Sequence, residues 1–106
     1  MTTLRLDLRS SGQTVTVAPG DRLELKLEEN PTTGFRWVFA EDGVPCFSLV
    51  SDAYEGGGAP GAGGEHKWQM KAVQLGNCEL RLFYRRSFEP DASPARSFVL
   101  HVKVTG

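Results

Sequence analysis

The chain has 106 residues, of which 40% are hydrophobic and 24% charged, so we expect one soluble globular domain spanning residues 1–106. A formal net charge of −1 gives no electrostatic basis for binding nucleic acid or an anionic membrane. No apolar run reaches the roughly 18 residues of a membrane span, so neither nucleic acid nor a membrane is expected as a partner.

Apolar residues alternate with polar ones along most of the chain, and clusters of turn residues separate the alternating runs. This period of two predicts half-buried strands, and no window has the 3.6-residue period of a long helix. Trp37 and Trp68 are each in phase with buried neighbours and are expected in the core. The expected strands cover residues 4–8, 15–17, 23–28, 35–40, 46–50, 66–74, 78–85 and 97–104.

Seven to eight short strands with one apolar face each predict an all-β fold. We expect two antiparallel sheets packed face to face, as in an immunoglobulin-like antiparallel β-sandwich. A small barrel is the alternative.

The direction of successive strands predicts where the connections lie. If the strands alternate up and down, the connections 30–34, 51–65 and 86–96 fall at one end of the sandwich. The plain turns 41–45 and 75–77 fall at the other end. Unusual loops gathered at one end of a rigid sandwich are typical of a binding surface, so we expect three functional loops there.

The first of these loops is a hexapeptide of conformationally restricted residues. Pro31 fixes its own φ at about −65°, and the threonines that follow are stiff at χ1. Gly34 admits a positive φ that other residues avoid. An ordinary tight turn is the simple interpretation, but two threonines at a rigid tip also look like presented side chains. The residues are Asn30, Pro31, Thr32, Thr33, Gly34 and Phe35.

Segments in the three loops resemble the motifs of the chagasin family, protein inhibitors of papain-like cysteine peptidases. The family patterns are Asn-Pro-Thr-Thr-Gly followed by an aromatic residue, Gly-X-Gly-Gly, and Arg-Pro followed by an aromatic residue. Here the first pattern is complete at residues 30–35, and chain length and motif order agree from end to end. The second and third patterns match Gly61, Ala62, Gly63 and Gly64, and Arg86, Ser87 and Phe88. Ser87 stands where the family has proline, so the third loop loses a rigidifying residue.

The resemblance implies a reversible, tight-binding inhibitor that is a monomer and not an enzyme. Loops 30–35, 56–66 and 85–90 would occlude the active-site cleft of a papain-like peptidase. Thr32 and Thr33 would enter the cleft at the catalytic cysteine. The glycine loop would lie along the non-primed side, and the third loop would cover the primed side.

Two other function classes stay open at this point. An immunoglobulin-like binding module could use the same loops for another protein or a glycan. A small enzyme with a Cys–His pair is improbable, because His101 lies on a polar strand face and Cys46 lies at the end opposite His66. The four-ligand spacing of a zinc site is absent from the sequence, so no metal or cofactor is expected.

The two cysteines each begin a predicted strand at the end away from the three loops, one on each sheet. A disulfide between Cys46 and Cys78 is therefore conceivable if their Cα atoms approach within about 7 Å. Two buried thiols are the preferred expectation, because the N-terminus carries no export signal. As written the chain is expected in the cytoplasm, and in the periplasm or outside the cell if a signal was removed.

Overall fold

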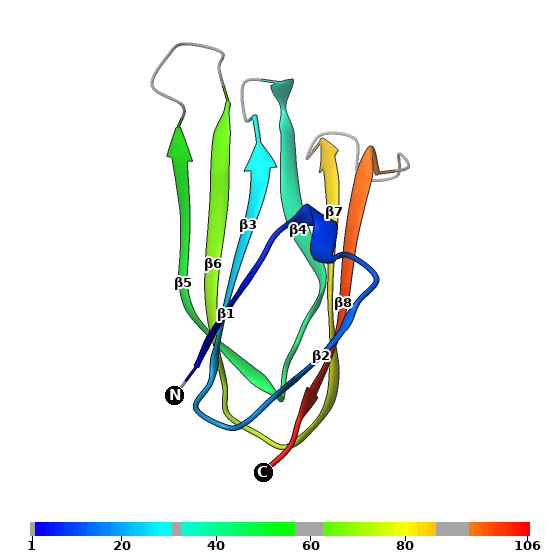
Figure 1. Ribbon diagram of the computed structural model, residues 1–106. Helices are drawn as coiled ribbons and strands as arrows, with labels where there is room; N and C mark the ends of the chain where they lie inside the picture. Colours follow the sequence, from blue (N-terminus) through cyan, green and yellow to red (C-terminus); the bar gives the residue numbers. More distant parts are fainter. Residues whose placement is uncertain (1, 31–32, 57–62, 87–93) are drawn as a thin grey trace.

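Two four-stranded sheets pack face to face in the computed structural model, which describes residues 2–30, 33–56, 63–86 and 94–106 (Figure 1). The strand orders are β1-β3-β6-β5 and β2-β8-β7-β4. The all-β sandwich with seven to eight strands is confirmed, and among the described residues no helix is long and apolar enough to span a membrane. The strands are β1 (Thr3–Leu6), β2 (Thr14–Val17), β3 (Arg22–Glu29), β4 (Phe35–Asp42), β5 (Phe47–Gly56), β6 (Gly64–Ala72), β7 (Gly76–Arg86) and β8 (Arg96–Val104).

The core lies between the sheets and is built from the residues that the alternation placed on inner faces. Leu25 of β3, Leu82 of β7 and Phe98 of β8 are completely buried. Trp37 and Trp68 are also buried, as predicted. Each such side chain contributes about 1.5–3 kcal/mol relative to an exposed one, so the core holds the loop-bearing strands rigidly.

The expectation that every strand pair would be antiparallel is wrong. Strand β1 pairs with β3, and β2 pairs with β8, both in parallel. A short 3₁₀ helix, η1 (Leu8–Ser10), carries the chain from one sheet to the other, so β1 and β2 join different sheets. Because Asp7 caps η1 through the backbone N–H of Arg9, Leu8 leaves the strand pattern and is exposed instead of buried.

The hairpin formed by β5 and β6 is longer than predicted. The alternation placed a loop at 51–65, but pairing continues to Gly56 opposite Gly64. The polar run Ser51–Glu55 lies on an edge strand that is exposed on both faces, so it has no apolar alternation to reveal it.

The three connections predicted to lie together do so. Strands β3, β5 and β7 end, and β4, β6 and β8 begin, at the same end of the sandwich, which is uppermost in Figure 1. We call it the loop end. Both chain termini lie toward the opposite end.

A disulfide joins the sheets at the opposite end. Cys46 lies just before β5 and Cys78 lies on β7, and their Cα atoms are 6.2 Å apart. Their predicted placement at the end away from the loops is confirmed, although Cys46 precedes its strand instead of starting it. The preferred expectation of two thiols is wrong. The turn that precedes β5 explains the bridge, because it holds Cys46 inside the core, where only 2% of the residue is exposed.

Candidate functional site

The first loop is closed by hydrogen bonds between its own ends. The backbone N–H of Thr33 donates to the carbonyl of Asn30 at 3.2 Å, and the Thr33 hydroxyl donates to the same carbonyl at 2.7 Å. Gly34 has a φ of +84°, the conformation for which glycine was expected. Thr33 is exposed, as predicted. Its hydroxyl proton is already used within the loop, so it is not offered to a partner.

Tyr84 supports this loop from β7. Its hydroxyl accepts a hydrogen bond from the backbone N–H of Asn30 at 3.0 Å, and its ring stacks on Phe35 at 5.3 Å. Its carbonyl accepts from the N–H of Ala95, close to the start of β8. Sequence reasoning missed this residue, because its phase with Leu80 and Leu82 indicated only a core position. Tyr84 fixes both ends of the first loop to the strand that leads into the third.

Arg86 brings the third motif against the first. Phe35 and Arg86 are register partners across β4 and β7, and the guanidinium carbon lies 4.7 Å from the centre of the Phe35 ring. A cation–π contact of this kind contributes about 0.5–1 kcal/mol at an exposed site. It also gives the aromatic residue of the first motif a structural role.

The last two glycines of the second motif are required by close packing. Gly63 has a φ of +72°, and a Cβ atom added there would lie 3.2 Å from the Cβ of Asn30. A Cβ atom added to Gly64 would lie only 2.0 Å from the carbonyl oxygen of Glu55. The second loop therefore enters β6 beside the first loop, and there is no room for a side chain at Gly63 or Gly64.

Not every predicted site residue can be placed. The described members of the three motifs lie together at the loop end, at the ends of β3 and β7 and the starts of β4 and β6: Asn30, Thr33, Gly34, Phe35, Gly63, Gly64 and Arg86. The others lie outside the described residues: Pro31, Thr32, Gly61, Ala62, Ser87 and Phe88.

A buried carboxylate lies beneath the loops. Glu29 is 4% exposed, and its Oε2 accepts a hydrogen bond from the backbone N–H of Trp37 at 2.9 Å. Its Oε1 lies 3.1 Å from Nδ1 of His66. Sequence reasoning missed this contact, because a glutamate at a strand end is ordinarily solvated.

The described residues offer no constellation for covalent or metal chemistry. Both cysteine sulfurs are bonded to each other, so neither can act as a nucleophile with a histidine. Within the described ranges no group of three or more His, Cys, Asp or Glu side chains is arranged to hold a metal ion.

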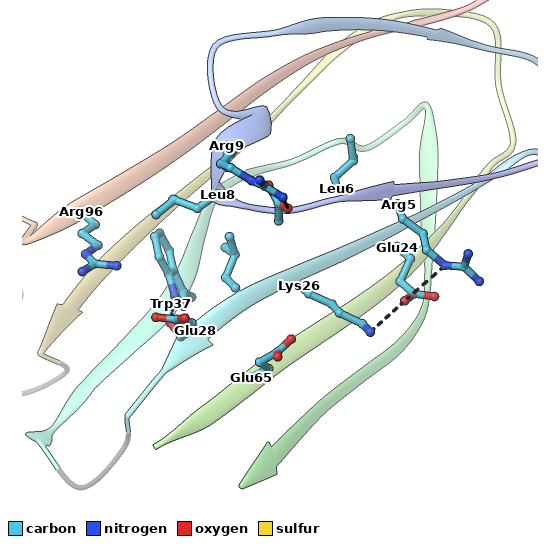
Figure 2. Close-up of a pocket in the computed structure, with 12 residues that line it drawn as sticks. Arg5, Leu6, Leu8, Arg9, Glu24, Lys26, Glu28, Trp37, Glu65 and Arg96 are labelled. Carbon is cyan, nitrogen blue, oxygen red and sulfur yellow. Dashed lines mark hydrogen bonds and ion pairs between the residues drawn. The ribbon is translucent and has the colours of Figure 1, made fainter. Parts of the chain in front are cut away.

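A cleft of about 460 Å³ lies on the flank of the sandwich, between β1, η1 and β3 (Figure 2). Leu8 and the edge of Trp37 line its apolar part, beside Arg96. Its charges partly neutralise one another, since Glu24 lies 3.6 Å from Lys26. It contains none of the motif residues, so the candidate site is the loop end and not this cleft.

The chain is similar over most of its length to known proteins. Residues 16–102 match the sequence model of the chagasin family of peptidase inhibitors, I42. Amoebiasin-1 of Entamoeba histolytica is 34% identical over 97 residues, which cover 90% of this chain and 93% of that protein. Chagasin of Trypanosoma cruzi is 29% identical over 99 residues, with 88% and 90% covered. The solved structure of the cysteine protease inhibitor EhICP2 from E. histolytica has a TM-score of 0.90 at 25% identity and covers 99% of this chain and 97% of its own.

Proposed function

The chain belongs to the chagasin family of peptidase inhibitors, and we propose that it inhibits papain-like cysteine peptidases reversibly by closing the active-site cleft with its loop end. The first loop enters the cleft at the catalytic cysteine. The second loop lies along the non-primed side, and the third covers the primed side.

One observation carries this proposal: described residues of the three motifs contact one another. Asn30 meets Gly63, and Phe35 meets Arg86. The three loops therefore share one base on a rigid core. A preformed base lowers the conformational entropy that is lost on docking, so more of the contact energy is available as affinity.

Each loop offers a different kind of contact. Threonines at the tip of the first loop fill a narrow cleft, and Gly63 and Gly64 let the backbone of the second loop approach the enzyme closely. The third loop contributes an arginine, Arg86, and an aromatic residue, Phe88, residue types that are enriched at interfaces.

Titration into papain with a fluorogenic substrate tests the proposed function. We expect inhibition that is lost on dilution, and no inhibition of serine peptidases or metallopeptidases. Incubation with excess active papain, followed by intact mass measurement, should return the full-length chain. A cut within residues 30–35 with undiminished papain activity would identify the protein as a substrate.

The disulfide should contribute to stability and not to inhibition. Cys46 and Cys78 are separated by 32 residues, so the bridge is expected to add about 3–4 kcal/mol to the free energy of unfolding. Because it lies at the end away from the loops, reduction should lower the melting temperature and leave papain inhibition unchanged. Circular dichroism establishes that the reduced protein is folded. A folded, reduced protein that no longer inhibits would contradict the placement of the site.

A further inference from the structure

A line of side-chain contacts crosses the sandwich beneath the loop end. Asp52 of β5 contacts Nε2 of His66 on β6. His66 Nδ1 lies 3.1 Å from Glu29 of β3, whose second oxygen accepts from the backbone N–H of Trp37 on β4. The line therefore connects β3 and β4, the strands on either side of the first loop, to the hairpin β5–β6, which carries the second.

The side-chain contacts of His66 are made with residues other than its partners in the backbone ladder. His66 is the register partner of Leu27 on one side and of Tyr54 on the other. Glu29 and Asp52 are each two residues from those partners, so the imidazole reaches diagonally to both neighbouring strands. Its ring also stacks on Trp68, with centroids 4.0 Å apart and planes 5° from parallel.

Both contacts are hydrogen bonds when the ring is protonated and the two carboxylates are ionised. An ionised carboxylate only accepts hydrogen bonds, and both ring nitrogens face a carboxylate oxygen. An imidazolium donates from both nitrogens, whereas a neutral imidazole has one N–H and would turn a lone pair toward the other carboxylate. The aromatic face of Trp68 also favours a cation.

Among the residues that the structure describes, few titratable groups face this ring. From β3 there is Glu29, and from β5 there are Asp52 and the phenol of Tyr54. The nearby inner-face residues of β4, Trp37 and Phe39, carry no charge. On β6 itself, neighbouring charged residues alternate to the outer face. The charged groups that face the His66 ring are therefore the carboxylates of Glu29 and Asp52.

We propose that protonated His66 is a pH-dependent clasp that ties β3 to both strands of the β5–β6 hairpin beneath the inhibitory loops. When the ring loses its proton, the contact with Asp52 breaks first, because the Asp52 side chain is 48% exposed and the Glu29 side chain only 3%. The outer strand β5 of the hairpin that carries the second loop then loses its side-chain tie, through His66 and Glu29, to the base of the first loop. Inhibition is thus strongest at acid pH and weakens as pH rises through the range in which histidine changes charge, about pH 5–8.

The inhibitory consequence rests on the proposed function, but the clasp itself can be measured without a peptidase. A double-mutant cycle of His66→Gln and Asp52→Asn, read by urea unfolding, should show coupling at about pH 5.5 that disappears by about pH 8. No coupling at acid pH would refute the clasp. If His66→Gln does not fold, Asp52→Asn alone still tests the idea. Its free energy of unfolding should be lower than that of wild type at acid pH, and the difference should shrink as pH rises.

Papain inhibition tests the second half of the proposal. The inhibition constant of His66→Gln should exceed that of wild type by about five- to tenfold at acid pH, and by much less at alkaline pH. His101→Gln is the matched control, since His101 is exposed on β8 beside Glu79. Taking the ratio at each pH cancels the titration of papain itself. A ratio for His66→Gln that stays constant with pH would overturn the link to inhibition, whereas a wild type that never inhibits would instead overturn the proposed function.

Discussion

Replacing Thr32 and Thr33 together with arginine is expected to raise the inhibition constant for papain by about a hundredfold or more. The proposed function puts these residues at the centre of the interface, where water is excluded and hot spots concentrate. Two long cations there would be buried without a partner or would hold the loop out of the cleft. Their effect should exceed that of replacing any charged residue in the three loops, since charges at the rim contribute little.

The fold should survive this double replacement. Thr33 is exposed, and its hydroxyl donates to the Asn30 carbonyl and accepts a long hydrogen bond from the Phe35 backbone N–H. Losing both costs about 1–3 kcal/mol in total. Thr14→Arg with Thr16→Arg is the matched control, because both threonines are exposed on β2, away from the loop end. The control should inhibit like wild type. Equal inhibition by the loop variant would show that the first loop does not enter the cleft.

The sequence was informative wherever burial follows a simple period. Leu23, Leu25 and Leu27 alternate because one face of β3 meets the core, and the same reasoning located most strands. Strand alternation alone then gathered the three loops at one end. Neither step needed any knowledge of side-chain contacts.

Other features have no periodic signal. The outer half of β5 is exposed on both faces, so its residues do not alternate, and the hairpin with β6 was predicted too short. The parallel pairing of β1 with β3 and of β2 with β8 depends on η1, which carries the chain between the sheets. This helix has only three residues and is capped locally by Asp7. The buried state of Glu29 depends on Trp37 and His66, which approach it only in the folded chain.

Gly64→Ala is expected to weaken both stability and inhibition. A Cβ atom at this position would lie 2.0 Å from the carbonyl oxygen of Glu55 and 2.8 Å from the Cα of Gly56. No rotamer relieves this contact, because Cβ is fixed to the backbone, so β5 and β6 must separate. Overpacking typically costs about 1–3 kcal/mol, and here backbone must move, so the free energy of unfolding should fall by at least that amount.

Inhibition should weaken about tenfold or more, because Gly63 would be carried away from Asn30 and the second loop would lose its base. Gly56→Ala is the matched control: Gly56 is the register partner of Gly64, yet the nearest atom to its added Cβ is the Tyr54 ring at 3.8 Å, an ordinary contact. It should stay within about 0.5 kcal/mol of wild type. If the two variants have the same free energy of unfolding and the same inhibition constant, β5 and β6 do not approach each other as closely at Gly64 as described. If Gly64→Ala loses stability but inhibits papain as well as wild type, the second loop contributes nothing to the interface, and the first and third loops must account for the inhibition.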